Sequence, residues 1–131
     1  MASETCRLAL VILAVEDLAR ARAFYAAAFG WTERVAVSVY AEFELPAGMC
    51  LGLYERRGFA LNTGETPCQI PAGAIASTEL YFVVLDLDAE IARVTAAGAR
   101  PLSPRMVRGW GDEAAYFADP DGNVLVLSCP A

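Results

Sequence analysis

The stretch AYFADPDGNVLVLSCP, residues 115–130, decides the fold of this chain. Runs of aromatic and β-branched residues lie on both sides of Asp-Pro-Asp-Gly at 119–122, a pattern typical of the two arms of a β-hairpin. Proline fixes φ, glycine supplies a positive φ, and aspartate side chains accept bonds from nearby amides. The sequence therefore predicts a hairpin whose last arm turns Val124 and Val126 to one side of a sheet and Leu125 to the other.

The same pattern occurs earlier in the chain. PAGMCLGLY from Pro46 matches PDGNVLVLS from Pro120, and the Val-x-Asp-Leu at 15–18 matches the one at 84–87. Each half therefore reads as a strand, a helix and three strands, over about 7–54 and 79–129. Halves of this size bury too little surface to fold alone, so we predict one α+β domain, 1–131, built from two packed units.

The helices are predicted at 18–30 and 87–98, with Asp17 as a cap and Gly30 and Gly98 as stops. The continuous apolar run at 8–15 predicts a strand buried on both faces. Residues 55–78 have no clear period and are expected to be a long lid or linker loop. The remaining strands are expected at 32–37, 39–45, 49–55, 79–88, 114–118 and 123–129.

Composition limits the function. The 131 residues are 56 % hydrophobic, carry a net charge of −6 and contain no histidine. An acidic chain without a basic stripe is unsuited to nucleic acid or anionic membranes, so we expect neither as a partner. Any mechanism must also work without imidazole.

The four cysteines are not spaced as a metal or redox site, and we interpret Cys6, Cys50, Cys68 and Cys129 as buried, reduced thiols. The apolar run at 8–15 lacks the basic flank and cleavage site of a signal peptide, and it is too short for a membrane span. These features predict a cytoplasmic protein.

Together, LAVEDLARARAFYAAAFGW, the Trp110-Gly111 corner and AYFADPDGNVLVL resemble the vicinal-oxygen-chelate superfamily over about residues 7–129. This group includes glyoxalase I, the extradiol dioxygenases and the bleomycin-resistance proteins. The resemblance implies paired βαβββ units that form a curved mixed sheet, with helices on its convex face and a ligand on its concave face. It also implies a homodimer.

Metal-dependent members of that superfamily place ligands on the first and fourth strands of each unit. Carried over by position, those ligands fall on Leu10, Gly52, Glu79 and Val126. Leucine, glycine and valine side chains donate nothing to a cation, so the comparison implies no metal and no cofactor. Shifting the alignment along the last strand recovers no carboxylate.

Strand alternation then gives the lining of the expected cup. The side chains turned inward, with Trp110 as a wall, form an apolar and aromatic surface suited to a small molecule. The ligand-binding residues predicted in this way are Leu10, Ile12, Cys50, Gly52, Tyr54, Glu79, Tyr81, Trp110, Val124 and Val126.

Glu79 is the candidate catalytic residue, because an acid in an apolar cup can serve as a general acid or base. The competing interpretation is a solvated Glu79, or one paired with Arg105 or Arg108. Those two arginines are interpreted as surface charges rather than an anion clamp, and Glu42 with Glu44 as an exposed face.

We therefore expect a metal-free protein of the bleomycin-resistance type that sequesters a hydrophobic or aromatic compound, cations among the options. One alternative is a lyase- or isomerase-like enzyme that uses Glu79 or an atypical metal site. Another is an interaction module whose cup is filled by its own side chains.

Overall fold

The computed structural model describes residues 4–131. These residues cluster into two compact units, which are described separately. The first holds the chain up to Arg22 together with Trp31–Pro67, and the second holds Ala23–Gly30 and Cys68–Ala131.

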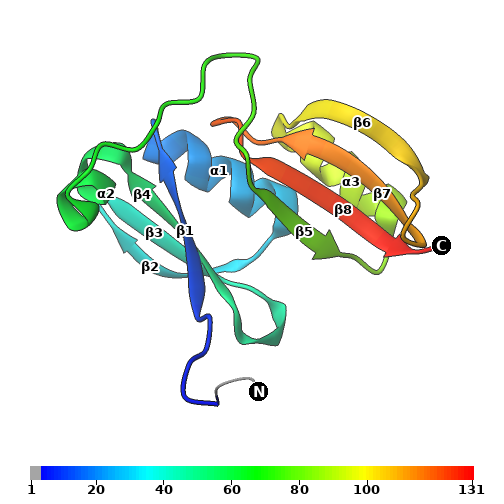
Figure 1. Cartoon of the computed structure of the whole chain (residues 1–131), viewed down its shortest axis with the longest axis horizontal. Helices are drawn as coiled ribbons and strands as arrows, with labels where there is room; N and C mark the ends of the chain where they lie inside the picture. Colours follow the sequence, from blue (N-terminus) through cyan, green and yellow to red (C-terminus); the bar gives the residue numbers. More distant parts are fainter. Residues whose placement is uncertain (1–3) are drawn as a thin grey trace. The chain divides into compact units, whose positions relative to one another are not determined.

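The first unit is a four-stranded sheet in the order β1-β4-β3-β2 (Figure 1). Its strands are β1 (Leu10–Val15), β2 (Thr32–Val37), β3 (Tyr40–Glu44) and β4 (Cys50–Glu55). β1 pairs with β4 in parallel, and the other pairs are antiparallel. A turn at Pro46–Gly48 joins β3 to β4, and a short helix, α2 (Arg56–Thr63), follows β4.

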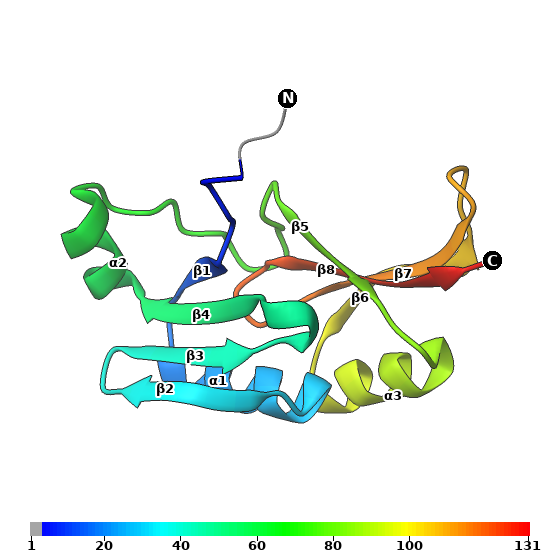
Figure 2. The same cartoon turned by 90° about the horizontal axis from the view of Figure 1, so that it is seen from below.

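The second unit repeats this plan, with strand order β5-β8-β7-β6. Its strands are β5 (Glu79–Val83), β6 (Arg100–Val107), β7 (Asp112–Ala118) and β8 (Val124–Pro130). Helix α3 (Leu87–Ala97) lies along one face of this sheet (Figure 2). β5 pairs with β8 in parallel, as β1 does with β4, so the predicted α+β repeat is confirmed.

The helix boundaries follow from local chemistry. Helix α1 (Leu18–Phe29) begins after Asp17, whose carboxylate accepts a bond of 3.1 Å from the Arg20 amide. It ends at Gly30, where φ is +66°. Asp86 caps α3 in the same way, and Gly98 ends α3 at a φ of +107°. The predicted cap and both predicted stops are therefore confirmed.

The Asp-Pro-Asp-Gly turn is held by the carboxylate of Asp119. It accepts hydrogen bonds from the amides of Asp121 and Asn123, at 2.9 and 2.8 Å, and from the Asn123 side chain at 2.9 Å. Tyr25 of α1 donates a fourth, at 2.5 Å. Asp119 and Tyr25 are both buried, and Gly122 has a φ of +88°. The turn is thus a structural element anchored to a helix.

Alternation along the strands separates an inner from an outer face in each sheet. Leu51 and Leu53 of β4 are at most 2 % exposed, and Leu125 and Leu127 of β8 are fully buried. In the second unit, Phe82 of β5 packs against Phe29 of α1, with the ring centroids 4.9 Å apart and the rings tilted by 38°. The face of the second sheet that carries Phe82 and Leu127 is therefore the one covered by helices.

Some sequence predictions were wrong. The segment 55–78 contains α2 and so is not a structureless loop, and β1 is not buried on both faces, since Ile12 is 37 % exposed. The cysteines form no disulfide, but Cys6 and Cys68 are exposed and the other two are only half-buried. No helix within residues 4–131 has the length and apolar character needed to cross a membrane.

Candidate functional site

Four of the predicted site residues share the helix-free face of the second sheet. The ladder places Glu79 beside Val124 and Tyr81 beside Val126. Val124 and Val126 are buried and form a cluster with Ala114. Leu102 and Tyr116 pack against that cluster. The two valines are thus buried on this face, with Tyr81 and Tyr116 on the strands either side of Val126.

The aromatic side chains of this face are joined by hydrogen bonds. The indole Nε1 of Trp110 donates to the hydroxyl oxygen of Tyr81 at 2.8 Å. That hydroxyl donates in turn to Oδ2 of Asp112 at 2.6 Å. Trp110 is 58 % exposed and Tyr81 is 41 % exposed. The two rings are therefore held in place while a large part of each faces solvent. We call Tyr81, Trp110 and Tyr116 the aromatic platform.

Tyr116 is the third member of the platform. Its ring lies under the guanidinium of Arg108, whose central carbon is 4.9 Å from the ring centroid. Burial raises the pKa of the Tyr116 hydroxyl, and the negative charge of Glu79 raises that pKa further, while Arg108 opposes the change. Tyr116 therefore keeps its proton at neutral pH and remains a hydrogen-bond donor.

Glu79 stands at the edge of the platform. It begins the edge strand β5, is exposed, and forms no ion pair with any residue in the described chain. The pairing with Arg105 or Arg108, one of the alternatives for Glu79, is not seen, and Arg105 instead binds Asp88 and Glu113. The Glu79 carboxylate is thus a solvated charge beside the platform rather than an acid enclosed by apolar groups.

The other predicted site residues share one face of the first sheet. The ladder pairs Leu10 with Cys50 and Ile12 with Gly52. Tyr54 is one step further along the same face, and its ring is 5.0 Å from that of Tyr40. Tyr54 also borders a groove of about 280 Å³ beside α2. The structure therefore groups the predicted residues by unit, five in the first unit and five, Trp110 included, in the second.

An ionic network around the buried Glu42 is on the same face. Glu42 accepts a hydrogen bond of 2.6 Å from the Tyr40 hydroxyl. It also forms an ion pair with Arg34, whose Nε atom is 2.9 Å from the carboxylate. Glu42 is only 8 % exposed, so the prediction of an exposed face was wrong for this residue. Burial, then the bond to Glu42, raises the pKa of Tyr40 above its ordinary value. Tyr40 therefore stays neutral.

The four positions to which the family resemblance assigns metal ligands offer a cation a single donor group. Leu10, Gly52 and Val126 present hydrocarbon or no side chain, which leaves Glu79 as the one donor. The space beside Gly52 is also taken, because a Cβ atom there would be 2.4 Å from the Tyr40 hydroxyl oxygen. Within residues 4–131 no three His, Cys, Asp or Glu side chains are grouped as a metal site.

Sequence reasoning missed several residues of these faces. Tyr116 could have been found, because it alternates with Ala114 on the strand before the predicted hairpin. Glu42 could have been placed beside Gly52 only with the register of β3 on β4. For Arg108, the sequence held no signal, because its position depends on how a long side chain folds back along the sheet.

Comparisons with known proteins agree with this architecture. The family model for the glyoxalase/bleomycin resistance protein/dioxygenase superfamily matches residues 7–127. The chain belongs to this superfamily. No protein among the curated sequences matches it.

Solved structures of this superfamily are similar in fold. A glyoxalase-related enzyme from Fulvimarina pelagi has a TM-score of 0.83 and 22 % identity, over 94 % of this chain and 87 % of that one. A glyoxalase/bleomycin resistance protein/dioxygenase from Nocardioides has a TM-score of 0.80 and 22 % identity, over 99 % of this chain and 86 % of that one. A family enzyme from Burkholderia phytofirmans PsJN has a TM-score of 0.80 and 19 % identity, over 96 % of this chain and 100 % of that one. At such identities the likeness establishes the fold alone.

Proposed function

We propose that this superfamily member binds a small hydrophobic or aromatic molecule on its aromatic platform and holds it without a metal ion. The observation that carries the proposal is the exposed pair Trp110 and Tyr81, which a hydrogen bond fixes at 2.8 Å, with Tyr81 beside the buried Val126 in the sheet. Large exposed apolar surfaces of this kind mark binding sites on folded proteins.

The fixed rings favour binding because they lose little freedom when a ligand arrives. Tyr81 is already held at its hydroxyl from two sides, by Trp110 and Asp112. A planar ligand that covers about 100 Å² of apolar surface gains about 2.5 kcal/mol from burial alone. Stacking against a ring adds about 0.5–1.5 kcal/mol. Binding that is largely apolar and non-covalent fits sequestration, the role of an antibiotic-resistance protein, better than turnover.

The test is a nitrogen–proton NMR titration that follows the two indole N–H signals. The chain has two tryptophans, and Trp31 packs on Phe43 in the first unit, so it is an internal control. The probes are 2-naphthylmethanol, 2-naphthoate and 2-naphthylmethylammonium, which share a ring system and differ in charge. We expect at least one probe to shift the Trp110 signal saturably and to leave Trp31 in place. If no probe moves Trp110 more than Trp31, the proposal is wrong.

We also propose a homodimer, with support from the edge of the second sheet. Val83 is 74 % exposed at the end of the edge strand β5, and Leu85, two residues later, is fully exposed. Apolar side chains along an edge strand favour association with another chain. Sedimentation equilibrium checks this, and a Val83→Lys variant should shift the protein toward monomer. A monomer at all concentrations would contradict the proposal.

The alternative of an enzyme that uses Glu79 has one observation in its favour. Its carboxylate has no ion-pair partner within residues 4–131, and it is close enough to Tyr116 to raise the pKa of that hydroxyl. A carboxylate beside a protonated phenol can exchange a proton with a bound molecule. Chemical change of a bound probe that is lost in Glu79→Gln would favour this reading over simple sequestration.

A further inference from the structure

The guanidinium of Arg108 is held in an unusual way. Its Nη2 atom donates to the carbonyl oxygens of Pro104, at 2.6 Å, and Ala114, at 2.9 Å, and to the Ser103 hydroxyl at 3.1 Å. Its Nε atom donates to the Ala114 oxygen at 3.2 Å. Within residues 4–131, Nη1 has no hydrogen-bond partner and no carboxylate is within ion-pair distance of this arginine.

The irregular pairing of β6 with β7 explains these contacts. The ladder between the two strands shifts between Ser103 and Met106. The Arg108 side chain supplies donors to carbonyl oxygens at this irregularity. A carbonyl oxygen satisfies a donor but does not neutralise a positive charge. Arg108 is thus fixed, half-buried on the Tyr116 ring, and still carries its full charge beside the platform.

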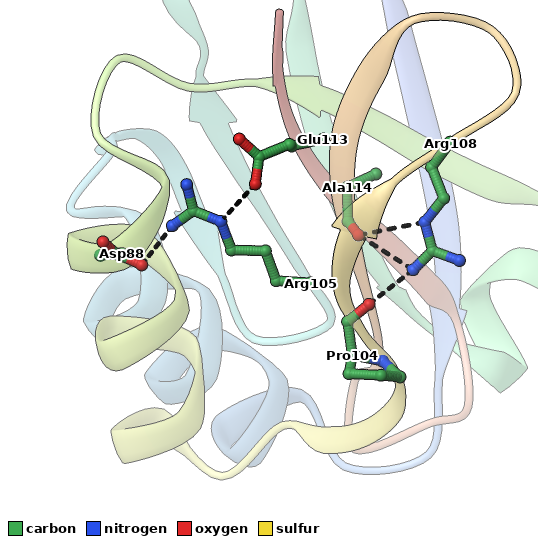
Figure 3. Close-up of polar contacts among 6 residues, drawn as sticks. All are labelled: Asp88, Pro104, Arg105, Arg108, Glu113 and Ala114. Carbon is green, nitrogen blue, oxygen red and sulfur yellow. Dashed lines mark hydrogen bonds and ion pairs between the residues drawn. The ribbon is translucent and has the colours of Figure 1, made fainter. Parts of the chain in front are cut away.

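Arg105, three residues earlier, is the opposite case (Figure 3). Its Nη1 pairs with Asp88 of α3, and its Nε pairs with Glu113 at 2.8 Å. Two carboxylates neutralise this guanidinium on the helix-covered side of the sheet. The sequence placed both arginines in one segment and led us to interpret both as surface charges rather than an anion clamp. In the structure, Arg105 forms ion pairs with two carboxylates, whereas Arg108 has no carboxylate partner among residues 4–131.

The acidic groups of the helix-free face do not compensate Arg108. The carboxylate of Asp112, on β7, accepts a hydrogen bond from the Tyr81 hydroxyl. Glu79 is on β5, at the opposite edge of the sheet from β6. Among residues 4–131, neither acid is within ion-pair distance of the Arg108 guanidinium, which lies over the Tyr116 ring. A ligand that carries a negative group is therefore attracted to Arg108, and its ring can still cover the platform.

We propose that the preferred ligand is an aromatic carboxylate, whose ring stacks on the aromatic platform and whose carboxylate accepts a hydrogen bond from Nη1 of Arg108. This inference rests on the proposed binding function and specifies its ligand class. A carboxylate is the chemical complement of a guanidinium with a remaining N–H donor, and charge-assisted bonds of this type are about twice as strong as neutral ones.

The three naphthyl probes test this inference in the unaltered protein by isothermal titration calorimetry. They share one ring system, so differences in affinity report the charged group. We expect 2-naphthoate to bind about tenfold more tightly than 2-naphthylmethanol, the effect of one hydrogen bond to a charged group. The ammonium probe is expected to bind most weakly. If the alcohol or the ammonium binds as tightly as the carboxylate, the inference is wrong while the proposed function stands. If none binds, the proposed function itself fails.

Matched variants assign the selectivity to one residue. In Arg108→Gln the affinity for 2-naphthoate should fall to that for the alcohol, whose own affinity should change little. Arg105→Gln is the control, because it removes a guanidinium on the other side of the sheet and should keep the tenfold preference. Retained preference in Arg108→Gln would overturn the inference. If that variant does not fold, the comparison of probes on the unaltered protein still decides.

Discussion

Replacing Gly52 by alanine should destabilise the first unit through a specific clash. The new Cβ atom would be 2.4 Å from the Tyr40 hydroxyl oxygen and 2.9 Å from the nearest ring carbons. These distances are far below van der Waals contact, so the Tyr40 ring must move away. Moving it breaks the bond of 2.6 Å that the Tyr40 hydroxyl donates to Glu42.

The magnitude follows from the state of Glu42. A hydrogen bond to a charged group contributes about 1.5–3 kcal/mol. Glu42 is buried but retains its ion pair with Arg34, which places the loss in the lower part of that range. Alanine recovers about 0.5–1 kcal/mol, because it has less freedom than glycine in the unfolded chain. The net loss should be about 0.5–1.5 kcal/mol, a measurable part of the stability of a small domain.

Equilibrium unfolding in urea measures this loss, and a double-mutant cycle isolates its cause. Tyr40→Ala removes the ring that Gly52→Ala would meet, so the second change should cost little in that background. We expect a coupling of about 1 kcal/mol or more between the two sites. If Gly52→Ala is neutral, or if the two changes add within about 0.5 kcal/mol, then the Tyr40 ring is not what demands glycine here.

Three further predictions concern the second unit. Burial, then the charge of Asp119, raises the pKa of Tyr25 well above its ordinary 10.0. The stabilising contribution of the protonated phenol is therefore complete below pH 10.0 and is lost as the pH rises above it. In Tyr25→Phe, the free energy of unfolding, measured with denaturant, should fall less between neutral and alkaline pH than in the unaltered protein. Gly122→Ala should lower the free energy of unfolding by about 1–2 kcal/mol, because φ is +88° at this position. The midpoint of thermal unfolding should fall accordingly, and an unchanged midpoint would show that alanine is not strained there. Arg105 lowers the pKa of Glu113, so carboxyl NMR titration of Arg105→Gln should find that pKa raised toward 4.5, and an unchanged value would argue against the ion pair.

The order of elements could be predicted because its signals are local. Asp17 caps a helix through an amide three residues away, and Gly30 ends it through its own φ. Strand alternation likewise placed Tyr81 and Val126 on one face, since side chains alternate with a period of two and the parallel ladder sets them side by side. Repetition of the pattern in both halves made the fold class secure.

The wrong or missing predictions depend on contacts between distant segments. Alternation says that Tyr40 and Glu42 share a face, but burial of that face depends on Arg34 from the neighbouring strand. Pro104 marks the register shift between β6 and β7, but it does not reveal that the Arg108 side chain donates to carbonyl oxygens there. Chemistry at a site is therefore less readable from sequence than the scaffold, because long polar side chains are placed by their neighbours in space.

Tyr25 has a consequence for the history of the repeat. Although it belongs to the first copy in sequence, it lies with residues 23–30 in the second compact unit and completes the bonds of Asp119 there. A fragment cut at the junction after Pro67 would leave the second copy without this phenol. We therefore expect the two separately expressed fragments to gain structure only when mixed. If so, the duplicated halves have become mutually dependent and could no longer revert to independent copies.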